Sequence, residues 1–464
     1  MTPDQREAVR SNAKYLRNLR PVDPEEVADY VEGGPHPATV RQVLRESAVD
    51  LGLVEREDGV FVPVAEAPIE PLTGPVEAVP DRYARVLEDR LAERLGPTWW
   101  DGASGDELRA VIRRLKEDYY RGRDVAYDAV AALGYAVYHL PDYYAAVQYV
   151  LDDLARTGRL PRELRVLDVG AGSGGPALGL VDLLPEEALL DYHAVEPSPA
   201  ADVLEAMLAE TGPNVHPTVH RTTAEAFEPE GDYDLVLLAN VLSELDDPVS
   251  VADRCADHVA PGGSLVLLAP ADRETSVGLR GVERALVNGL TVYGPTVRLW
   301  PDAEPDSRCW SFDVRPDLDV PEFQRRLDES AGGAGEFVNV DVQFSYAILR
   351  PDGARRLEVE LDRGRFARLA DAEAHVTERV DCAAIKLSHD LADGGNPLFL
   401  VGDGSEGVDQ YAVLTRETSL NRDLAEATYG DLLVFESVLV LWNDDEGAFN
   451  LVVDDETSVD RVGP

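Results

Sequence analysis

Lysine is nearly absent from this sequence of 464 residues. The three lysines are Lys14, Lys116 and Lys386. Lysines and arginines together number 43, against 88 acidic residues, and the resulting formal net charge of −45 is spread along the chain. Molar salt shortens the Debye length to about 3 Å and removes the self-repulsion of such a surface. We therefore expect a protein of a halophilic archaeon. The alternative is an acidic protein that avoids nucleic acid, but charge of halophilic origin does not exclude RNA.

Cysteine is scarce, and long apolar runs are missing. Cys255, Cys309 and Cys382 are far apart and odd in number, which excludes a disulfide framework and a CxxC metal site. No stretch approaches the roughly 20 apolar residues that cross a bilayer. The polar start MTPDQREAVRSNAKYL does not resemble a signal peptide. We expect reduced thiols, no metal site, no membrane partner and a soluble, cytoplasmic protein.

The chain is too long for one hydrophobic core, so we expect several domains. The first, residues 1–65, contains three helix-like stretches and then two short apolar runs around the turn-forming pair Asp58-Gly59. This order predicts a winged-helix-like domain. The three stretches are roughly residues 3–18, 24–32 and 37–52.

A linker and a helical domain follow. Residues 66–80 are rich in proline and acidic residues and lack periodicity, which predicts a linker, whereas residues 81–158 have helical spacing throughout. Within the helical domain, residues 109–123 concentrate five arginines and a lysine around Tyr119 and Tyr120. These side chains suit phosphates and bases, and ion pairs with the neighbouring carboxylates are an equally good interpretation.

The segment LRVLDVGAGSGG, residues 164–175, predicts a strand, a glycine turn and then a helix. Gly170, Gly172 and Gly174 lack a Cβ atom, so the backbone can turn sharply and approach a ligand, and the helix offers free N–H groups. A second strand, DYHAVEPS, ends in Glu196, where a carboxylate can accept both hydroxyls of a ribose.

NAD-binding domains share that arrangement, but three features favour S-adenosylmethionine. Asp168 lies just before the glycines, two residues ahead of Gly170, in a loop that reads DVGAGSGG. DYDLVLLANVLSEL predicts a fourth strand whose following loop, from Asn240 to Ser243, would border the methyl donor. HVAPGGSLVLLAP predicts a Pro-Gly-Gly turn before a fifth strand. In this order the features resemble those of class I methyltransferases, and the resemblance implies an α/β, Rossmann-like core over residues 159–355.

The resemblance also implies roles for individual residues. Asp168 and the three glycines line the methionine and ribose region, and Glu196 holds the ribose hydroxyls. Ala224 and Glu225 flank the adenine, although Thr223 stands where many members have an acidic residue. No catalytic residue is recognisable. The Asn/Asp-Pro-Pro-Tyr loop of many amino-group methyltransferases is missing, and no cysteine stands in a Pro-Cys or Thr-Cys context after strands four or five, which argues against a covalent route to 5-methylcytosine.

A longer tract resembles a narrower family. Residues 81–355 resemble the mitochondrial small-ribosomal-subunit methyltransferase-like family. The resemblance is carried by the segment GYAVYHLPDYYAAVQYVLDDL before the glycines, and by CWSFDV followed by FSYAILRPDG after the fifth strand. Members of this family assist small-subunit assembly. Many relatives carry four cysteines that hold an iron-sulfur cluster, but Cys309 alone remains in this region, so we expect no cluster. Packing around Trp300 and Trp310 would replace it.

The C-terminal residues, 375–464, contain five short strand-like runs with a helical stretch between the third and fourth. This pattern predicts an OB-like β-barrel, a fold that often binds single-stranded nucleic acid. The candidate residues for base stacking are Phe399, Tyr411, Phe435 and Trp442. The candidate phosphate partners are Lys386, Arg416 and Arg422.

Together these domains favour a methyltransferase-like protein acting on small-subunit ribosomal RNA or its assembly intermediates, either as an enzyme or as a non-catalytic assembly factor. Its expected partner is the small ribosomal subunit or its RNA, and no DNA partner is expected. The alternative is a methyltransferase of a small molecule or protein.

Overall fold

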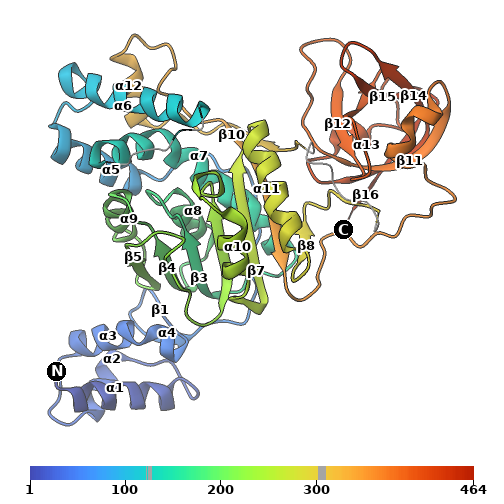
Figure 1. The fold of residues 1–464 in the computed structure, drawn as a ribbon. Helices are drawn as coiled ribbons and strands as arrows, with labels where there is room; N and C mark the ends of the chain where they lie inside the picture. Colours follow the sequence, from blue (N-terminus) through green and yellow to red (C-terminus); the bar gives the residue numbers. More distant parts are fainter. Residues whose placement is uncertain (122, 124–127, 301–309, 464) are drawn as a thin grey trace. The chain divides into compact units, whose positions relative to one another are not determined.

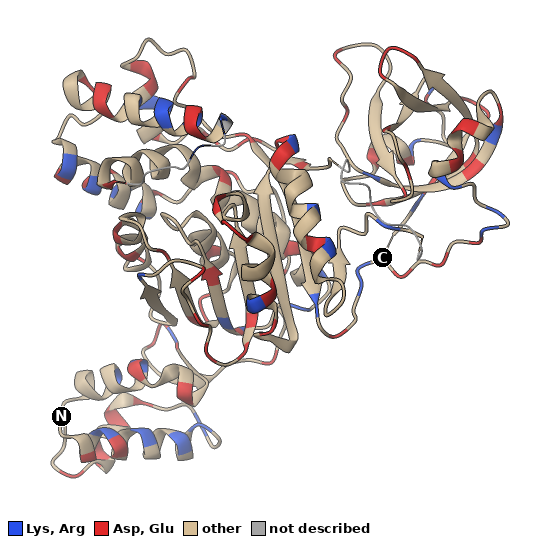
Figure 2. Ribbon diagram, in the orientation of Figure 1, with Lys and Arg blue, Asp and Glu red and all other residues tan. Residues whose placement is uncertain are grey.

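The computed structural model describes residues 1–121, 123, 128–300 and 310–463 (Figure 1). The chain divides into two compact units, Met1–Ala239 with Pro316–Val342, and Asn240–Arg315 with Gln343–Pro464. Acidic side chains are distributed over helices and loops of both units (Figure 2). Among the described residues, no helix has the length and apolar composition needed to cross a bilayer.

The first unit begins with a small helical subdomain. Thr2 caps the first helix, because its side chain accepts from the N–H of Gln5 while the Gln5 side chain accepts from the N–H of Thr2. Asp58 and Gly59, with φ of 81° at the glycine, form the turn of a two-stranded antiparallel sheet. The predicted helices and hairpin are therefore present. The elements are α1 Pro3–Leu16, α2 Pro24–Tyr30, α3 Pro37–Glu46, α4 Ala48–Leu51, β1 Leu53–Glu55 and β2 Phe61–Pro63.

Residues 66–80 contain no helix or strand, as expected for a linker, but they are bonded to the helical domain. The N–H of Leu72 donates to Asp152 Oδ1 over 2.7 Å, and the N–H of Val76 donates to the Tyr149 hydroxyl over 2.8 Å. The segment is thus fixed along the third helix of that domain. The helices are α5 Asp81–Leu95, α6 Gly102–Tyr120 and α7 Ala129–Arg156.

Four parallel strands form the sheet of the first unit, in the order β5-β4-β3-β6. Strands β3, β4 and β6 are largely apolar and buried along most of their length, as expected for a parallel sheet covered on its faces, whereas the edge strand β5 is only partly buried. Successive strands run outward from β3 to β5, and the chain then returns to pair β6 with β3 on the other side. The elements are β3 Glu163–Val169, α8 Gly175–Leu183, β4 Leu189–Val195, α9 Ala200–Leu208, β5 Val215–His220, β6 Tyr233–Ala239 and α12 Glu322–Glu329.

Helices α7 and α8 approach each other closely because of two glycines on α8. A Cβ atom at Gly179 would lie 2.3 Å from the carbonyl oxygen of Tyr144, and one at Gly175 would lie 3.0 Å from Tyr143 Cβ. No side chain fits at these positions. The glycines therefore hold the first turn of α8 against α7.

The second unit contains a strand, β10, that runs antiparallel to β7 and to β8 and also pairs with β9. The predicted Pro-Gly-Gly turn before the fifth strand is wrong, because β7 runs through these residues. Arg350 explains the extended backbone: its guanidinium donates to Gly262 O and to Ser264 Oγ over 2.8 and 2.7 Å. The elements are η1 Leu242–Glu244, α10 Pro248–Ala256, β7 Val259–Pro270, α11 Arg273–Leu286, β8 Thr291–Gly294, β9 Asp313–Arg315 and β10 Val342–Arg350.

The C-terminal part of the second unit is a closed five-stranded barrel. The strands follow the order β11-β12-β13-β15-β14, and β14 pairs with β11 to close the barrel. Strands β13 and β15 are parallel, and a sixth strand, β16, pairs with β14. The elements are η2 Leu369–His375, β11 Arg379–Lys386, β12 Leu398–Gly402, β13 Gln410–Leu414, α13 Asp423–Glu426, β14 Leu432–Asn443, β15 Ala448–Val453 and β16 Ser458–Val462.

Candidate functional site

The carboxyl ends of three parallel strands are tied together by backbone hydrogen bonds. The N–H of Gly170, after β3, donates to Val195 O at the end of β4 over 2.9 Å, and the N–H of Glu196 donates to His220 O at the end of β5 over 3.0 Å. Strand β3 is also where the strand order reverses. In open α/β sheets, ligands bind outside the carboxyl ends of the strands at such a point.

The glycine loop needs glycine for two different reasons. Gly170, Gly172 and Gly174 have φ of 74°, 55° and 98°, in the region where a side chain is strained. A Cβ at Gly174 would also lie 2.7 Å from Leu204 Cδ1, whereas one at Gly172 would meet nothing closer than 3.9 Å. Gly174 is therefore required for packing against α9, and the loop leaves space above Gly172.

Glu196 holds the glycine loop in place. Its Oε2 accepts from the N–H of Gly172 over 2.9 Å, and its Oε1 accepts from the N–H of Ser198 over 2.8 Å. An ionised carboxylate has about four acceptor sites, so two backbone donors leave room for two more. Glu196 can therefore position the loop and also accept both hydroxyls of a ribose.

Asp168 is completely buried at the end of β3. Its Oδ2 accepts from the Tyr192 hydroxyl over 2.5 Å, while its Oδ1 is buried without a hydrogen-bond partner. Burial raises the pKa of Asp168 to about 7, against the opposing Tyr192 hydrogen bond, and the charge of Glu196 adds to the rise. A half-satisfied carboxyl group below a glycine loop fits a ligand that brings positive charge.

The remaining predicted cofactor residues also follow strand ends. Ala224 is buried and Glu225 exposed in the turn after β5. Asn240, in the second unit, is the first residue after β6; it has φ of 60°, and its N–H donates to Leu268 O over 3.0 Å. Hydrogen bonds thus link the glycine loop with Glu196, and the pKa of Asp168 responds to the Glu196 charge.

Helix α7 contributes a polar strip that the sequence reasoning missed. Between Val130 and Ala155, all of which the structure describes, every residue is buried except five. These five, Tyr135, Tyr138, His139, Asp142 and Tyr143, are called the α7 strip below. The signal in the sequence was the spacing of Tyr135, His139 and Tyr143 at i, i+4 and i+8, which places polar aromatic residues on one face of an otherwise apolar helix.

The α7 strip borders the glycine loop. A Cβ built on Gly172 would lie 3.9 Å from Tyr135 Cε1, and one built on Gly175 would lie 3.0 Å from Tyr143 Cβ. His139 lies between these two rings, with ring centroids 4.9 Å from Tyr135 and 5.1 Å from Tyr143. Partly exposed aromatic and titratable groups therefore stand beside the loop.

The basic cluster of α6 is occupied mainly by contacts within the protein. Arg109 is buried and donates to Trp100 O and Ser330 Oγ, and Arg113 forms two 2.6 Å hydrogen bonds with Glu336. Arg121 and Arg123 form ion pairs with α6 carboxylates. The ion-pair interpretation of the cluster is thus the better one. The side chain of Tyr120 lies outside the described residues.

Three of the predicted nucleic-acid contacts in the barrel are wrong. Phe399 and Phe435 are buried in the barrel core. Lys386 is also buried; its ammonium donates to Leu424 O and Ala427 O over 2.8 and 2.7 Å, and burial lowers its pKa to about 8. Tyr411 is partly exposed and Trp442 is 41% exposed, so these two aromatics are on the outside.

The two described cysteines are buried and free, and burial raises the pKa of the Cys255 thiol to about 11. Cys309 lies outside the described residues. Over the described ranges, no three His, Cys, Asp or Glu side chains are grouped so that they could hold a metal ion. Trp300 is buried and donates to Asp403 Oδ2 over 2.6 Å, whereas Trp310 is 37% exposed.

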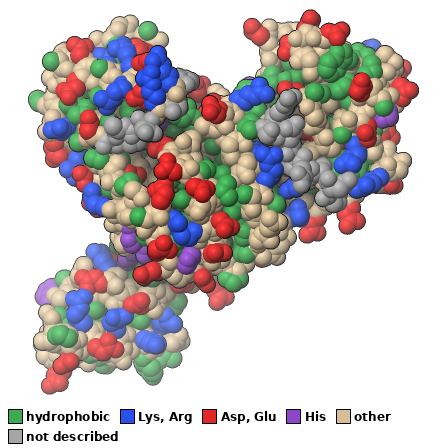
Figure 3. Space-filling view, viewed as in Figure 1, with side chains coloured by type: hydrophobic (Ala, Val, Ile, Leu, Met, Phe, Trp, Pro, Cys, Tyr) green, Lys and Arg blue, Asp and Glu red, His purple; other side chains and the backbone are tan. Residues whose placement is uncertain are grey.

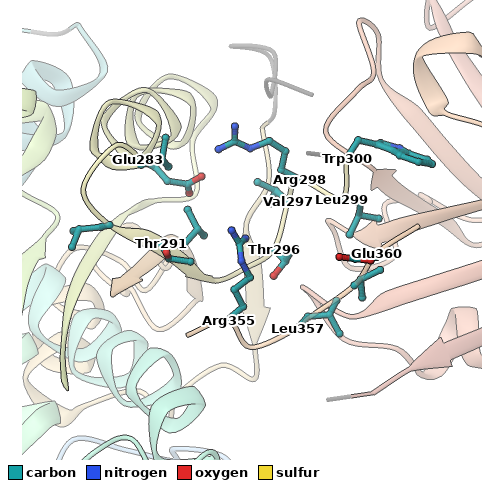
Figure 4. A pocket seen from close by; sticks show the side chains of 14 residues that line it. Glu283, Thr291, Thr296, Val297, Arg298, Leu299, Trp300, Arg355, Leu357 and Glu360 are labelled. Atoms are coloured by element: carbon teal, nitrogen blue, oxygen red, sulfur yellow. The ribbon is translucent and has the colours of Figure 1, made fainter. Parts of the chain in front are cut away.

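A cavity of about 470 Å³ lies in the second unit, between α11 and the segments that lead into the barrel (Figure 4). Arg298 and Arg355, two threonines and a row of apolar side chains line it. None of the predicted cofactor residues is among its lining residues. On the face drawn in Figure 3, basic side chains are interspersed with acidic ones.

Comparison with known proteins gives the class of the central domain. Residues 167–265 match a family model described as a methyltransferase domain. This span begins in β3, includes the glycine loop and Glu196, and ends in β7. The chain therefore contains a class I methyltransferase domain with a Rossmann-like fold. Residues 6–57 and 370–462 match the N-terminal and C-terminal domains of a domain of unknown function, DUF8157.

No curated protein matches the sequence. Among solved structures, similar chains include the N-methyltransferase NodS from Bradyrhizobium japonicum WM9 in complex with S-adenosyl-L-homocysteine, at 16% identity and a TM-score of 0.28, over 44% of this chain and 85% of that one. Precorrin-6y C5,15-methyltransferase from Geobacter metallireducens GS-15 has 16% identity and a TM-score of 0.30, over 44% and 86%. Because these scores are low, the assignment rests on the family model.

Proposed function

We propose that the protein is an S-adenosylmethionine-dependent methyltransferase-like protein that acts on small-subunit ribosomal RNA or its assembly intermediates. The observation that carries the proposal is a methyltransferase domain with an intact cofactor loop in the same chain as a closed barrel. The domain supports methyl transfer, and the barrel supports a nucleic-acid client.

The residues at the strand ends fit S-adenosylmethionine, which supplies a methyl group on a positively charged sulfur. Glu196 would accept the ribose hydroxyls, and the glycine loop would let the methionine part approach the backbone. The unpartnered Oδ1 of Asp168 would take a donor from the cofactor's amino group. Ala224 and Glu225 would border the adenine, and Asn240 the methyl donor.

The barrel supports the RNA part of the proposal through its topology and its outer side chains. Strand order 1-2-3-5-4-1, a parallel pairing of the third and fifth strands, and a helix before the fourth strand favour an OB-like barrel. Barrels of this kind bind single strands by stacking bases on aromatic rings. Tyr411 and Trp442 are the candidate stacking residues.

The N-terminal, winged-helix-like subdomain contributes less to this binding. On its first helix, Arg10 pairs with Asp50, and Arg17 donates to Leu51 O. The subdomain is also bonded to the region before β5, because Asn214 exchanges hydrogen bonds of 2.7 and 2.9 Å with the backbone of Glu55. We assign it a packing role.

The test is transfer of label from methyl-tritiated S-adenosylmethionine to free small-subunit RNA and to small-subunit particles in molar potassium chloride. Incorporation that is lost in Glu196→Ala and kept in Glu187→Ala, an exposed carboxylate after α8, is the expected result. Cofactor binding without incorporation would point to a non-catalytic assembly factor. Label on a metabolite or protein, with no RNA association, would overturn the RNA client.

A further inference from the structure

A proline in α7 leaves a backbone carbonyl beside the α7 strip without its helical donor, and side chains from elsewhere in the chain bond to this turn. Pro141 has no N–H, so the carbonyl of Val137 lacks its helical donor. The buried side chain of Gln324 fills this role, since its Nε2 donates to Val137 O over 2.8 Å. Asn339 Nδ2 donates to Tyr138 O over 3.0 Å. Residues from the returning segment 316–342 therefore hold the turn of α7 that carries His139.

His139 is surrounded by aromatic rings and one carboxylate. Its ring is nearly parallel to that of Tyr143, at an interplanar angle of 17°, and Tyr138 contacts it edge-on with centroids 4.9 Å apart. His139 Nδ1 lies 3.6 Å from Asp142 Oδ2 and 3.5 Å from Asn339 Nδ2. The side chain is 28% exposed, so a ligand beside the loop can reach it.

Asp142 is the half-buried partner of this histidine. Its Oδ1 is buried and accepts no hydrogen bond, and burial raises the pKa of Asp142 against the opposing effect of His139. Lys116 on α6 also faces the strip, with its Nζ 3.9 Å from the Tyr138 ring centroid. A positive charge on His139 would stabilise the Asp142 carboxylate, and the carboxylate would in turn stabilise that charge.

We propose that the α7 strip is the acceptor side of the methyl-transfer site, that His139 is the base that takes a proton from a nucleobase, and that Asp142 is its positioning residue. This inference rests on the proposed function. The observations that carry it are the position of the strip beside the glycine loop and the histidine–carboxylate pair between the tyrosines.

In the proposed step, one bond forms and one bond breaks at the methyl carbon. The acceptor nitrogen forms a bond to the methyl carbon as the carbon–sulfur bond breaks, and the sulfur keeps the electron pair. The proposed base is the tautomer of neutral His139 that carries its proton on Nδ1, toward Asp142. The proton on the acceptor nitrogen passes to the free Nε2, and Asp142 stabilises the imidazolium that forms. The proton then leaves to solvent, so no other reactant is needed.

The class of acceptor follows from the shape of the strip. Tyrosine rings that are partly exposed present flat, apolar faces with polar tips, and these suit a planar heteroaromatic ring splayed out of a single strand. Flat aromatic faces also attract cations, so the same strip could instead cover the cofactor's sulfonium. The two occupants predict different effects on cofactor affinity.

His139→Gln tests the proposal, with free small-subunit RNA as acceptor and methyl-tritiated S-adenosylmethionine. We expect kcat to fall about 100-fold or more, as for loss of a general base, while the Kd of S-adenosylhomocysteine changes less than about twofold. A general base acts in its unprotonated form, so kcat/KM of the wild-type protein should rise with pH, and this rise should disappear in the variant. His258→Gln, near the end of α10, is the matched control.

Asp142→Asn provides a second variant for the positioning role. We expect about a tenfold fall in kcat in the wild-type background and little further loss when His139 is already glutamine, because the two act as one unit. Additive losses would overturn the positioning role.

The failures are distinguishable. A wild-type protein that labels no RNA overturns the base, and it overturns the proposed function as well only when it also fails to associate with small-subunit RNA and particles. RNA labelling that survives His139→Gln within about threefold overturns the base alone. A weakening of S-adenosylhomocysteine binding by more than about tenfold in His139→Gln would assign the strip to the cofactor.

Discussion

The Glu196 carboxylate accepts a hydrogen bond from the Gly172 N–H across 2.9 Å, joining the residue after β4 to the middle of the glycine loop after β3. The side chain to which we assign the ribose hydroxyls also fixes the loop over which the cofactor would lie. Under this assignment, recognition of the ribose and the shape of the loop are coupled through one residue.

Glu196→Ala should weaken binding of S-adenosylhomocysteine at least tenfold, because each hydrogen bond to a charged group contributes about 1.5–3 kcal/mol. It should also lower the free energy of unfolding by about 1–3 kcal/mol, since two backbone N–H groups lose their acceptor. Calorimetric titration and denaturation in molar potassium chloride measure the two effects. Unchanged affinity would contradict the ribose assignment, and Glu187→Ala should change neither quantity.

The glycine loop and Glu196 could be predicted from the sequence because their requirements are local. A positive φ demands glycine, and a carboxylate directly after a buried strand lies at the carboxyl edge of the sheet. His139 and Asp142 could not be assigned in this way. Their place beside the loop depends on the close packing of α7 and α8 at Gly179, and on Gln324 and Asn339, which are almost 200 residues away in the sequence.

The inward-facing residues of the barrel could not be predicted from the sequence for another reason. Segment LFLV of β12 is apolar at every position, so its period of two does not reveal that Phe399 and Val401 point inward. Lys386 ends β11 where the carbonyls of Leu424 and Ala427 can receive its ammonium, a contact made by the fold alone. The strand-like runs and the helical stretch between the third and fourth were predictable, but the inner face was not.

Gly179→Ala should destabilise the protein by roughly 1–3 kcal/mol or more, because the added Cβ would lie 2.3 Å from Tyr144 O and 2.4 Å from Val147 Cγ1. The α7 strip should lose its register with the glycine loop at the same time. Denaturant unfolding measures the loss. Gly212→Ala is the matched control, since its Cβ would meet nothing within 4 Å, and equal stabilities of the two variants would contradict the packing argument.

Asp168 should make the stability of the cofactor-free protein depend on pH. Its pKa is raised from 3.8 to about 7 by folding, so the folded state binds more protons between these values. Its contribution is therefore fully present below about pH 4 and is lost as the pH rises through about 7. Asp168→Asn keeps the shape and should remove this decline. The free energy of unfolding of both proteins, measured from pH 5 to 8, tests this. Parallel curves would contradict the raised pKa of Asp168.

Trp442→Ala should weaken binding of single-stranded RNA by about 5-fold to 100-fold, because stacking of one base on an aromatic ring contributes about 1–3 kcal/mol. The indole is 41% exposed on β14 and contacts Phe449 edge-on, with centroids 4.8 Å apart, so its loss should cost little stability. Molar salt suppresses the phosphate contribution, which makes stacking the larger share of the affinity. Tyr30→Ala removes an aromatic residue that is 58% exposed on α2 and serves as the matched control. Fluorescence anisotropy with a labelled oligonucleotide in molar potassium chloride should separate the two variants, and equal affinities would exclude this face of the barrel as the stacking surface.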